Sequence, residues 1–227
     1  MINLWLILAL VAMGADWAAL RRGHTQVNYL TKPLALLMMV LWLWSAAQPG
    51  WVTFCFLLGL FFSLAGDAFL LLPHGYFMHG LIAFLAAHLC YLAGFLIGVD
   101  GLPITFLGLA GVVGVWAAVV MRKLTGAAKK NPHQRKMGIP IILYATAISL
   151  MFLFAVWTMF RADWPTEGAI LAACGALLFY FSDLLLAYDR FVRPVQNARL
   201  MVRITYHLGQ LALTAGVILY SYFPNLS

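Results

Sequence analysis

Long apolar stretches recur along the whole length of this chain and leave few folds open to it. A helix crosses the hydrocarbon core of a membrane with about 20 residues, at a rise of 1.5 Å per residue. The sequence supplies eight stretches near that length, separated by joins rich in Gly, Pro and charged residues. The predicted spans are residues 4–20, 31–48, 51–72, 76–98, 102–121, 139–160, 167–187 and 203–222.

The composition agrees with a membrane protein that has no water-soluble part. Of the 227 residues, 64% are hydrophobic and 9% are charged, whereas soluble domains carry roughly a quarter charged residues. The three cysteines, Cys55, Cys90 and Cys174, lie in apolar runs without CxxC spacing, so neither a disulfide framework nor a zinc site is indicated. We expect an all-α membrane protein, an eight-helix transmembrane bundle in which residues 1–227 form a single integral membrane domain.

The basic residues predict the orientation in the membrane. Thirteen of the 14 Lys and Arg fall on one side when loops are counted alternately, and the other side holds only Arg161. Cytoplasmic loops collect Lys and Arg, so we expect both termini outside and the basic loops, including residues 122–136, in the cytoplasm. The net charge of +7 is then a property of these loops and no sign of nucleic-acid binding. Since Arg21 and Arg22 follow the first apolar run, that run is expected to stay as an anchor and not to be cleaved as a signal peptide.

Two aspartates, Asp67 and Asp183, lie inside predicted spans. A carboxylate inside a span raises the free energy of membrane insertion by a few kcal/mol, and such residues usually face the bundle interior and mark a functional site. Each lies about five residues, or roughly 8 Å, before the cytoplasmic end of its span, so both could face one cavity. Gly59, Ser63 and Asp67 recur at i, i+4 and i+8, which predicts that Asp67 faces protein. The remaining acidic residues are placed at span ends or in loops: Asp16, Asp100, Asp163, Glu167 and Asp189.

Other polar side chains enter the spans near the same level. Lys32 precedes Pro33, which suits the first turn of a helix, so Lys32 is placed at the edge of its span, where it either snorkels to the surface or reaches an aspartate. His88 is expected deeper than the aspartates, in a site or in packing, with Tyr91 one turn further on the same face. The first two turns of the last span hold Tyr206, His207 and Gln210.

Spans 51–72 and 167–187 carry related strings, Gly66-Asp67 and Ser182-Asp183, each followed by leucines. A His-Leu pair follows one span later in both cases, at His88 and His207. This pattern predicts two four-helix parallel repeats with the aspartates as symmetry mates.

These strings resemble the YhhN-like family, the lysoplasmalogenases of bacterial and animal membranes. The resemblance covers residues 32 to 210 in order, whereas His207 departs from it, because the family often has an aromatic residue there. The matching segments are Lys32-Pro33-Leu34, Ser63 to Asp67, Leu72-Pro73, Gly80-Leu81, Phe84-Leu85, His88 to Tyr91, Leu178-Phe179, Ser182-Asp183, Thr205-Tyr206 and Gln210.

The resemblance implies hydrolysis of the vinyl ether bond of a lysoplasmalogen to a fatty aldehyde and a glycerophospho-ethanolamine or glycerophospho-choline. We expect the protein to lie in a bacterial inner membrane and to use no cofactor or metal. Protonation of a vinyl ether gives an oxocarbenium ion that water captures, so a protonated acid and an anion are needed; two nearby carboxylates supply both. We expect Asp67 and Asp183 to be that catalytic pair and Lys32 to hold the lysophospholipid's phosphate. The expected substrate-binding residues are Lys32, His88, Tyr91, Ser182, Tyr206 and Gln210.

Three alternatives remain open from the sequence. Asp67, Asp183, His88 and His207 are side chains of the kinds that bind zinc and could form a hydrolytic metal centre. The paired aspartates could instead carry protons or cations in a small-solute transporter. They could also serve only to fix the packing of the helices.

Overall fold

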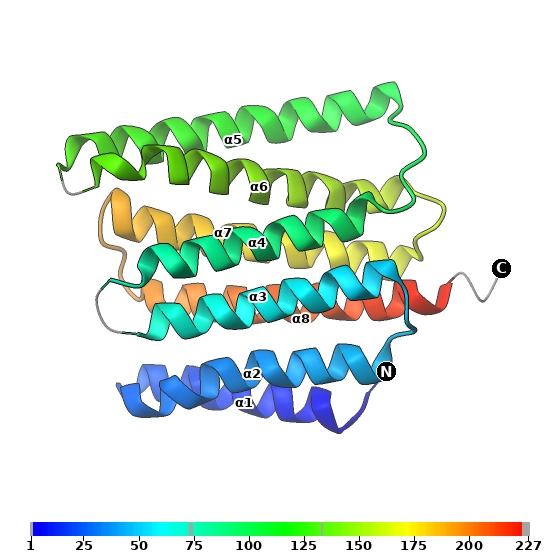
Figure 1. The fold of residues 1–227 in the computed structure, drawn as a ribbon, viewed down its shortest axis with the longest axis horizontal. Helices are drawn as coiled ribbons and strands as arrows, with labels where there is room; N and C mark the ends of the chain where they lie inside the picture. Colours follow the sequence, from blue (N-terminus) through cyan, green and yellow to red (C-terminus); the bar gives the residue numbers. More distant parts are fainter. Residues whose placement is uncertain (1, 73–74, 133, 224–227) are drawn as a thin grey trace.

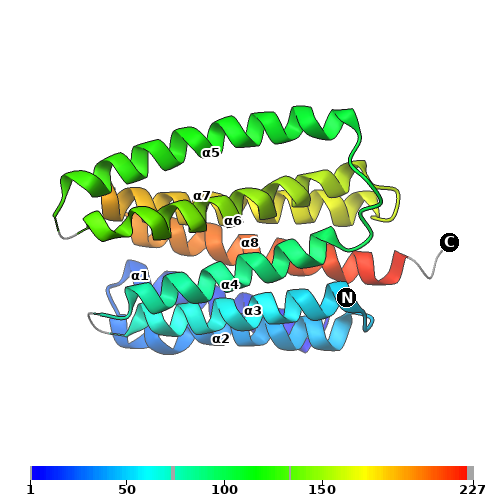
Figure 2. The same cartoon turned by 45° about the horizontal axis from the view of Figure 1, so that its top comes forward.

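The computed structural model describes residues 2–72, 75–132 and 134–223, and these residues are helical apart from short connections. Each helix runs antiparallel to the one before it, so the chain reverses direction at alternate ends of the bundle (Figure 1). Successive helices lie side by side except α4 and α5, which are separated by α6 (Figure 1 and Figure 2). Two short 3-10 segments, Arg135–Met137 and Thr158–Phe160, adjoin the sixth helix. The α-helices are α1 (Leu4–Arg21), α2 (Thr25–Ala46), α3 (Trp51–Leu71), α4 (Phe77–Leu96), α5 (Ile104–Lys130), α6 (Gly138–Trp157), α7 (Thr166–Phe191) and α8 (Ala198–Tyr222).

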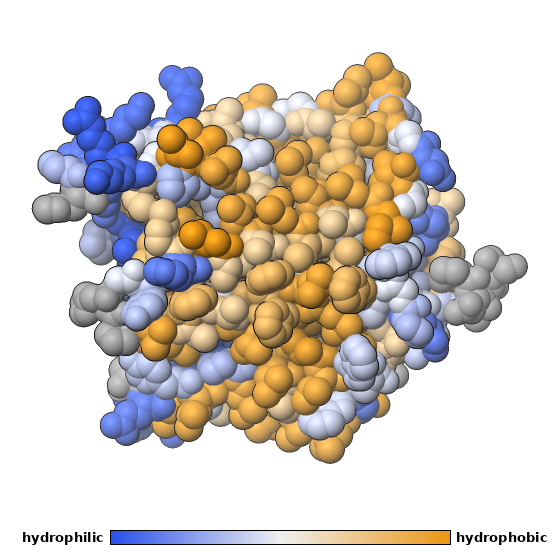
Figure 3. All heavy atoms as spheres, viewed as in Figure 1, coloured by the Kyte–Doolittle hydropathy of each residue, from blue (hydrophilic) through white to orange (hydrophobic). Residues whose placement is uncertain are grey.

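Seven of the eight described helices, α1 to α7, are long and apolar enough to cross a membrane. Large apolar side chains are exposed along them, and Figure 3 shows a broad hydrophobic belt with hydrophilic residues towards both ends of the bundle. The protein is therefore an integral membrane protein. Helix α8 does not meet the same measure, because its first half carries Arg199, Arg203, His207 and Gln210. That α8 also crosses the membrane stays a prediction, as do the two parallel repeats.

Four predicted spans differ from the helices by four or more residues at one end. Helix α8 begins at Ala198, five residues before its predicted span. Helix α2 begins at Thr25, so Lys32 lies two turns inside the helix and Pro33 is an interior proline. Helix α5 continues to Lys130, so much of the basic segment 122–136 is helical and not a loop. Helix α7 continues to Phe191. Apolar composition marks the stretch buried in lipid, whereas a helix can extend past it into the head groups and water. Pro73, His74 and His133, which the sequence places in joins, lie outside the described residues.

Helices α7 and α8 pack with their backbones unusually close. A β-carbon added at Gly175 would lie 2.6 Å from the backbone nitrogen of Leu213 and 2.8 Å from the carbonyl oxygen of Gly209. One added at Gly209 would lie 2.9 Å from the carbonyl oxygen of Gly175. Small residues allow this close approach of helices within a membrane. The contact fixes α8 against the helix that carries Asp183.

Gly175→Ala is expected to lower the stability of the folded protein by about 1–3 kcal/mol, because its methyl group meets backbone atoms that cannot move aside. Gly111→Ala is the matched control, since nothing lies within 4 Å of a β-carbon there, and it should be neutral or slightly stabilising. Thermal unfolding of both variants in the same detergent measures the difference. Equal midpoints for the two variants would contradict the close contact.

Candidate active site

Asp183 lies at the centre of a polar cluster formed by three helices. The hydroxyl of Tyr144, on α6, donates a hydrogen bond to Asp183 Oδ2 at 2.5 Å. His88 Nε2, on α4, is 3.0 Å from the same carboxylate oxygen and 2.9 Å from the Tyr144 hydroxyl. His88 is fully buried, and the Asp183 side chain is 12% exposed. When the proton is on Nε2, His88 donates to Asp183 and its buried Nδ1, which has no partner among the described residues, is an acceptor.

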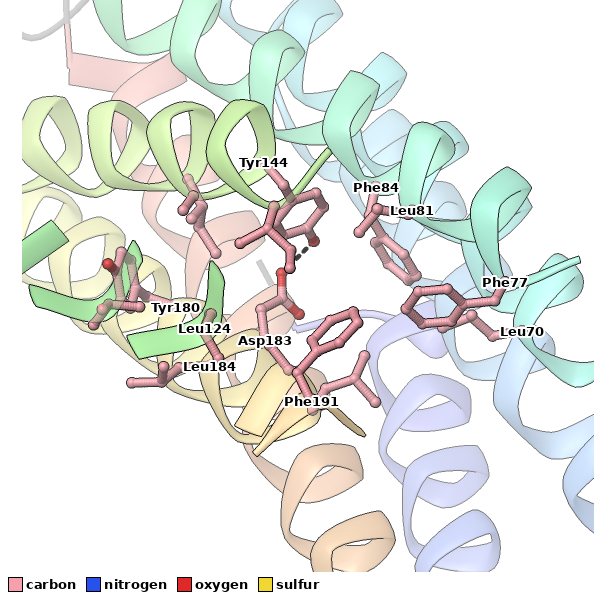
Figure 4. A pocket seen from close by; sticks show the side chains of 16 residues that line it. Leu70, Phe77, Leu81, Phe84, Leu124, Tyr144, Tyr180, Asp183, Leu184 and Phe191 are labelled. Carbon is pink, nitrogen blue, oxygen red and sulfur yellow. Dashed lines mark hydrogen bonds between the residues drawn. The ribbon is translucent and has the colours of Figure 1, made fainter. Parts of the chain in front are cut away.

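Asp183 also lines a half-open pocket between α3, α4, α5, α6 and α7. In Figure 4, Tyr144 and Asp183 point towards each other, and apolar side chains surround them. Asp183 is the only charged residue among the described residues that line it, so the pocket offers one carboxylate in an apolar wall. The lining residues are Leu70, Phe77, Leu81, Phe84, Val120, Leu124, Ile141, Tyr144, Ala145, Ile148, Tyr180, Asp183, Leu184, Leu186, Ala187 and Phe191.

Asp67 belongs to a different cluster. Lys32 Nζ lies 2.6 Å from Asp67 Oδ1; the Asp67 side chain is fully buried and that of Lys32 is 9% exposed. The same ammonium lies 5.8 Å from the centre of the Tyr206 ring. The hydroxyl of Tyr206 is buried without a hydrogen-bond partner in the described chain. The prediction that Lys32 could reach an aspartate is confirmed, and its charge is already balanced inside the protein.

Three of the residues expected to bind substrate are bonded to the protein itself. Tyr91 donates its hydroxyl proton to Gln210 Oε1 at 2.7 Å, and Gln210 Nε2 donates to Ser63 Oγ at 2.9 Å, with all three side chains buried. Ser182 Oγ donates to the backbone carbonyl oxygen of Val202 at 3.3 Å, which ties α7 to α8. The pocket lining includes none of Tyr91, Gln210 and Ser182. They hold helices together around the site.

Aromatic rings lie between the two carboxylate clusters. The Phe179 ring centre is 5.3 Å from that of Tyr206, beside Lys32, and 4.7 Å from that of His88, beside Asp183. Phe84 packs edge-on against both Phe179 and Tyr206. The prediction that both aspartates face one cavity is therefore wrong: Asp183 lines the pocket, whereas Asp67 is enclosed on the other side of these rings.

The depth estimates also need correction. Helix α7 continues eight residues past Asp183, but α3 continues only four past Asp67, so the two aspartates are not equally far from their helix ends. His88 was expected deeper than both aspartates, yet it contacts Asp183. Counting residues to the end of an apolar run measures depth only when the run and the helix end together.

The sequence missed two features of the polar interior. Tyr144 carried no signal, because its predicted span, 139–160, holds no charged residue or histidine. Asp16, placed at a span end, is fully buried, and Arg203 Nη1 lies 2.9 Å and 2.8 Å from its two carboxylate oxygens. Asn28 and Thr31 also donate to Asp16 Oδ1. The signal that could have found Asp16 is its place inside the first predicted span, 4–20. Arg203 gave no such signal, because the last predicted span begins at that residue, whereas α8 begins at Ala198.

The four candidate metal ligands are divided among separate places. His88 contacts Asp183 and Asp67 contacts Lys32, while His207 Nδ1 accepts a hydrogen bond from the indole nitrogen of Trp17 at 3.1 Å. In the described part of the chain, no three His, Cys, Asp or Glu side chains are grouped so that they could hold a metal ion together. The four side chains do not form the single centre considered from the sequence.

The amino-acid sequence matches a known protein family over most of its length. Residues 27–217 match the YhhN family. Lysoplasmalogenase TMEM86B of Rattus norvegicus is 31% identical over 193 residues, which cover 85% of this chain and 73% of that protein. Lysoplasmalogenase TMEM86A of Homo sapiens is 34% identical over 165 residues, or 70% of this chain and 63% of that protein, so the alignment spans less than two thirds of the human relative.

A bacterial relative is similar over a greater share of its own length. The uncharacterized membrane protein YhhN of Escherichia coli O157:H7 is 27% identical over 203 residues, which cover 87% of this chain and 90% of that protein. Comparison with solved structures finds no match. The family match covers most of the chain and includes both polar clusters, and the chain therefore belongs to the YhhN family.

Proposed function

We propose that this protein hydrolyses the vinyl ether bond of lysoplasmalogens and releases a fatty aldehyde and a glycerophospho-ethanolamine or glycerophospho-choline. The observation that carries the proposal is the pocket beside Asp183, whose apolar wall holds one carboxylate that is hydrogen-bonded to a tyrosine and a histidine. The names of the mammalian relatives support it. They also favour a hydrolase over the transporter considered from the sequence.

The pocket suits a lipid with a single chain. A lysophospholipid has one long apolar chain and a small polar end, and the lining provides an apolar channel between helices that themselves face the bilayer. The reacting double bond is the part of the chain nearest the polar end. It would lie against Asp183, with the rest of the chain among the leucines and aromatic rings.

One carboxyl group can carry the proton chemistry. Protonated Asp183 transfers its proton to the β-carbon of the vinyl ether, and the electron pair of the double bond forms the new C–H bond. The resulting carboxylate faces the oxocarbenium ion, which water attacks at the α-carbon. The hemiacetal that forms breaks its bond to the glycerol oxygen and gives aldehyde and alcohol. Since His88 and Tyr144 both bond to Asp183 Oδ2, they orient this carboxyl, and His88 can return the proton that water releases.

Asp67 has a different part in this mechanism from the one expected. Its carboxylate balances the charge of Lys32 in a closed cluster away from the pocket. We assign the pair a positioning role: it holds α2 and α3 together beside Tyr206, which packs against Phe84 at the pocket wall.

We also propose an orientation in the membrane. The end of the bundle with the α1–α2, α3–α4, α5–α6 and α7–α8 connections faces the cytoplasm of a bacterium, since it carries most of the basic residues.

Aldehyde release by the purified protein tests the function. With a synthetic lysoalkenyl phospholipid in D2O, we expect one equivalent of fatty aldehyde that carries a single deuterium on the carbon next to the carbonyl, because the proton added to the β-carbon derives from solvent. The lysoalkyl analogue, which lacks the double bond, should give no aldehyde. Absence of aldehyde from the alkenyl lipid, or aldehyde without deuterium, would refute the proposed chemistry.

A further inference from the structure

A basic side chain lies at the rim of the Asp183 pocket. The guanidinium carbon of Arg190, on α7, is 3.5 Å from the centre of the Phe77 ring. Phe77 lines the pocket, and so does Phe191, the residue that follows Arg190. Arg190 is itself exposed. A guanidinium held over an aromatic ring keeps a fixed place while its N–H groups remain able to donate to an anion.

The charge of Arg190 is not balanced within the described protein. Arg190 takes part in none of the four ion pairs found among residues 2–72, 75–132 and 134–223. The neighbouring carboxylate of Asp189 accepts a hydrogen bond from the backbone nitrogen of Val195. Lys32, the residue expected to hold a phosphate, is in contrast paired with Asp67 and almost fully buried. Arg190 is therefore the better placed cation for an anionic group that enters the pocket.

The spacing along α7 matches the dimensions of a lysoplasmalogen. Asp183 and Arg190 are seven residues apart, which is close to two full turns, so their side chains leave the same face of the helix roughly 10 Å apart along its axis. In the lipid, seven bonds join the β-carbon of the vinyl ether to phosphorus, a span of roughly 9 Å when extended, at the bond lengths of a polypeptide. One molecule can therefore reach both residues at once.

We propose that Arg190 binds the phosphate of the lysophospholipid and so sets which carbon of the chain lies beside Asp183. The lipid would enter with its phosphate at the Phe77 and Arg190 rim and its vinyl ether at Asp183. The remaining chain would continue past Tyr180 and Ile148, which line the pocket further from the rim. This inference rests on the proposed function, because it identifies the phosphate-bearing class of substrate for the same pocket.

Binding of a lipid that cannot react tests the inference without catalysis. Protein in nanodiscs is equilibrated with a radiolabelled lysoalkyl phospholipid, and unlabelled lysoalkyl phospholipid, alkylglycerol or inorganic phosphate competes. Arg190→Gln is expected to bind the lysoalkyl phospholipid about tenfold more weakly, the loss of one charge-assisted contact. Its affinity for alkylglycerol should be unchanged, and Arg190→Lys should lie between. In turnover of the alkenyl lipid, Arg190→Gln should raise KM and lower kcat, because the vinyl ether is no longer held beside Asp183.

Arg199→Gln is the matched control. It removes the same charge at the same end of the bundle, from an exposed position near the start of α8 and away from the pocket lining. It should bind both lipids as the wild type does. Equal binding of the phospholipid by wild type and Arg190→Gln would overturn the inference, and so would an equal loss for phospholipid and alkylglycerol. Competition by millimolar inorganic phosphate that depends on Arg190 would identify a free phosphate site instead. If the wild type released no aldehyde, the proposed function would fail, but these binding results would still decide the role of Arg190.

Discussion

Asp183→Asn is expected to lower kcat for aldehyde release by about 10²- to 10⁴-fold, the usual effect of losing a general acid. The asparagine oxygen can still accept the hydrogen bond from Tyr144, and the side chain has nearly the same shape, so the fold and the pocket should persist. The variant loses the proton that Asp183 transfers to the lipid and the carboxylate that remains after the transfer. The measurement is aldehyde release from the lysoalkenyl phospholipid at saturating substrate.

Asp100→Asn provides the control for this variant. Asp100 is an exposed residue in the connection after α4, far along the chain from the pocket lining, and the same change there should leave kcat within twofold. Both variants should unfold at nearly the wild-type temperature, which separates lost chemistry from lost folding. A folded Asp183→Asn protein with wild-type kcat would remove Asp183 from the mechanism.

The sequence predicted the helical spans well because one physical requirement dominates them. An apolar run of about 20 residues has few alternatives in a membrane, and α1, α3 and α4 begin and end within two residues of the predicted limits. The buried face of α3 was also predictable: Gly59, Ser63 and Asp67 are all buried, as their spacing indicated. Patterns local to one helix were therefore informative.

The arrangement of the helices around one another was not predictable in this way. Depth in the membrane is a single coordinate, and two carboxylates at similar depth can still face different sides of a bundle. Here the difference is decided by Phe84 and Phe179, two ordinary apolar residues whose rings lie between the clusters. Tyr144 contacts Asp183 because α6 packs beside α7. The sequence of one helix does not show which other helix lies next to it.

The second large effect is expected at the buried pair of Lys32 and Asp67. Asp67→Leu leaves the Lys32 ammonium buried without its counter-ion, and Lys32→Met leaves the Asp67 carboxylate in the same position. Each single substitution should lower the free energy of unfolding by about 3–5 kcal/mol, whereas the double variant, which replaces the pair by apolar side chains, should recover most of that loss. Denaturant unfolding in mixed micelles, on all four proteins, measures the coupling.

Activity of the double variant then separates a positioning role of Asp67 from a chemical one. If the pair only holds α2 and α3 in place, aldehyde release should recover with stability, to within about tenfold of the wild-type kcat. If Asp67 donates or accepts a proton in the reaction, the double variant should fold and remain as inactive as Asp183→Asn, because a leucine cannot carry a proton. A double variant that folds but is inactive would return Asp67 to the mechanism, and protons would then need a path past Phe84 and Phe179. A double variant that folds and is active leaves Asp183 as the acid in the pocket.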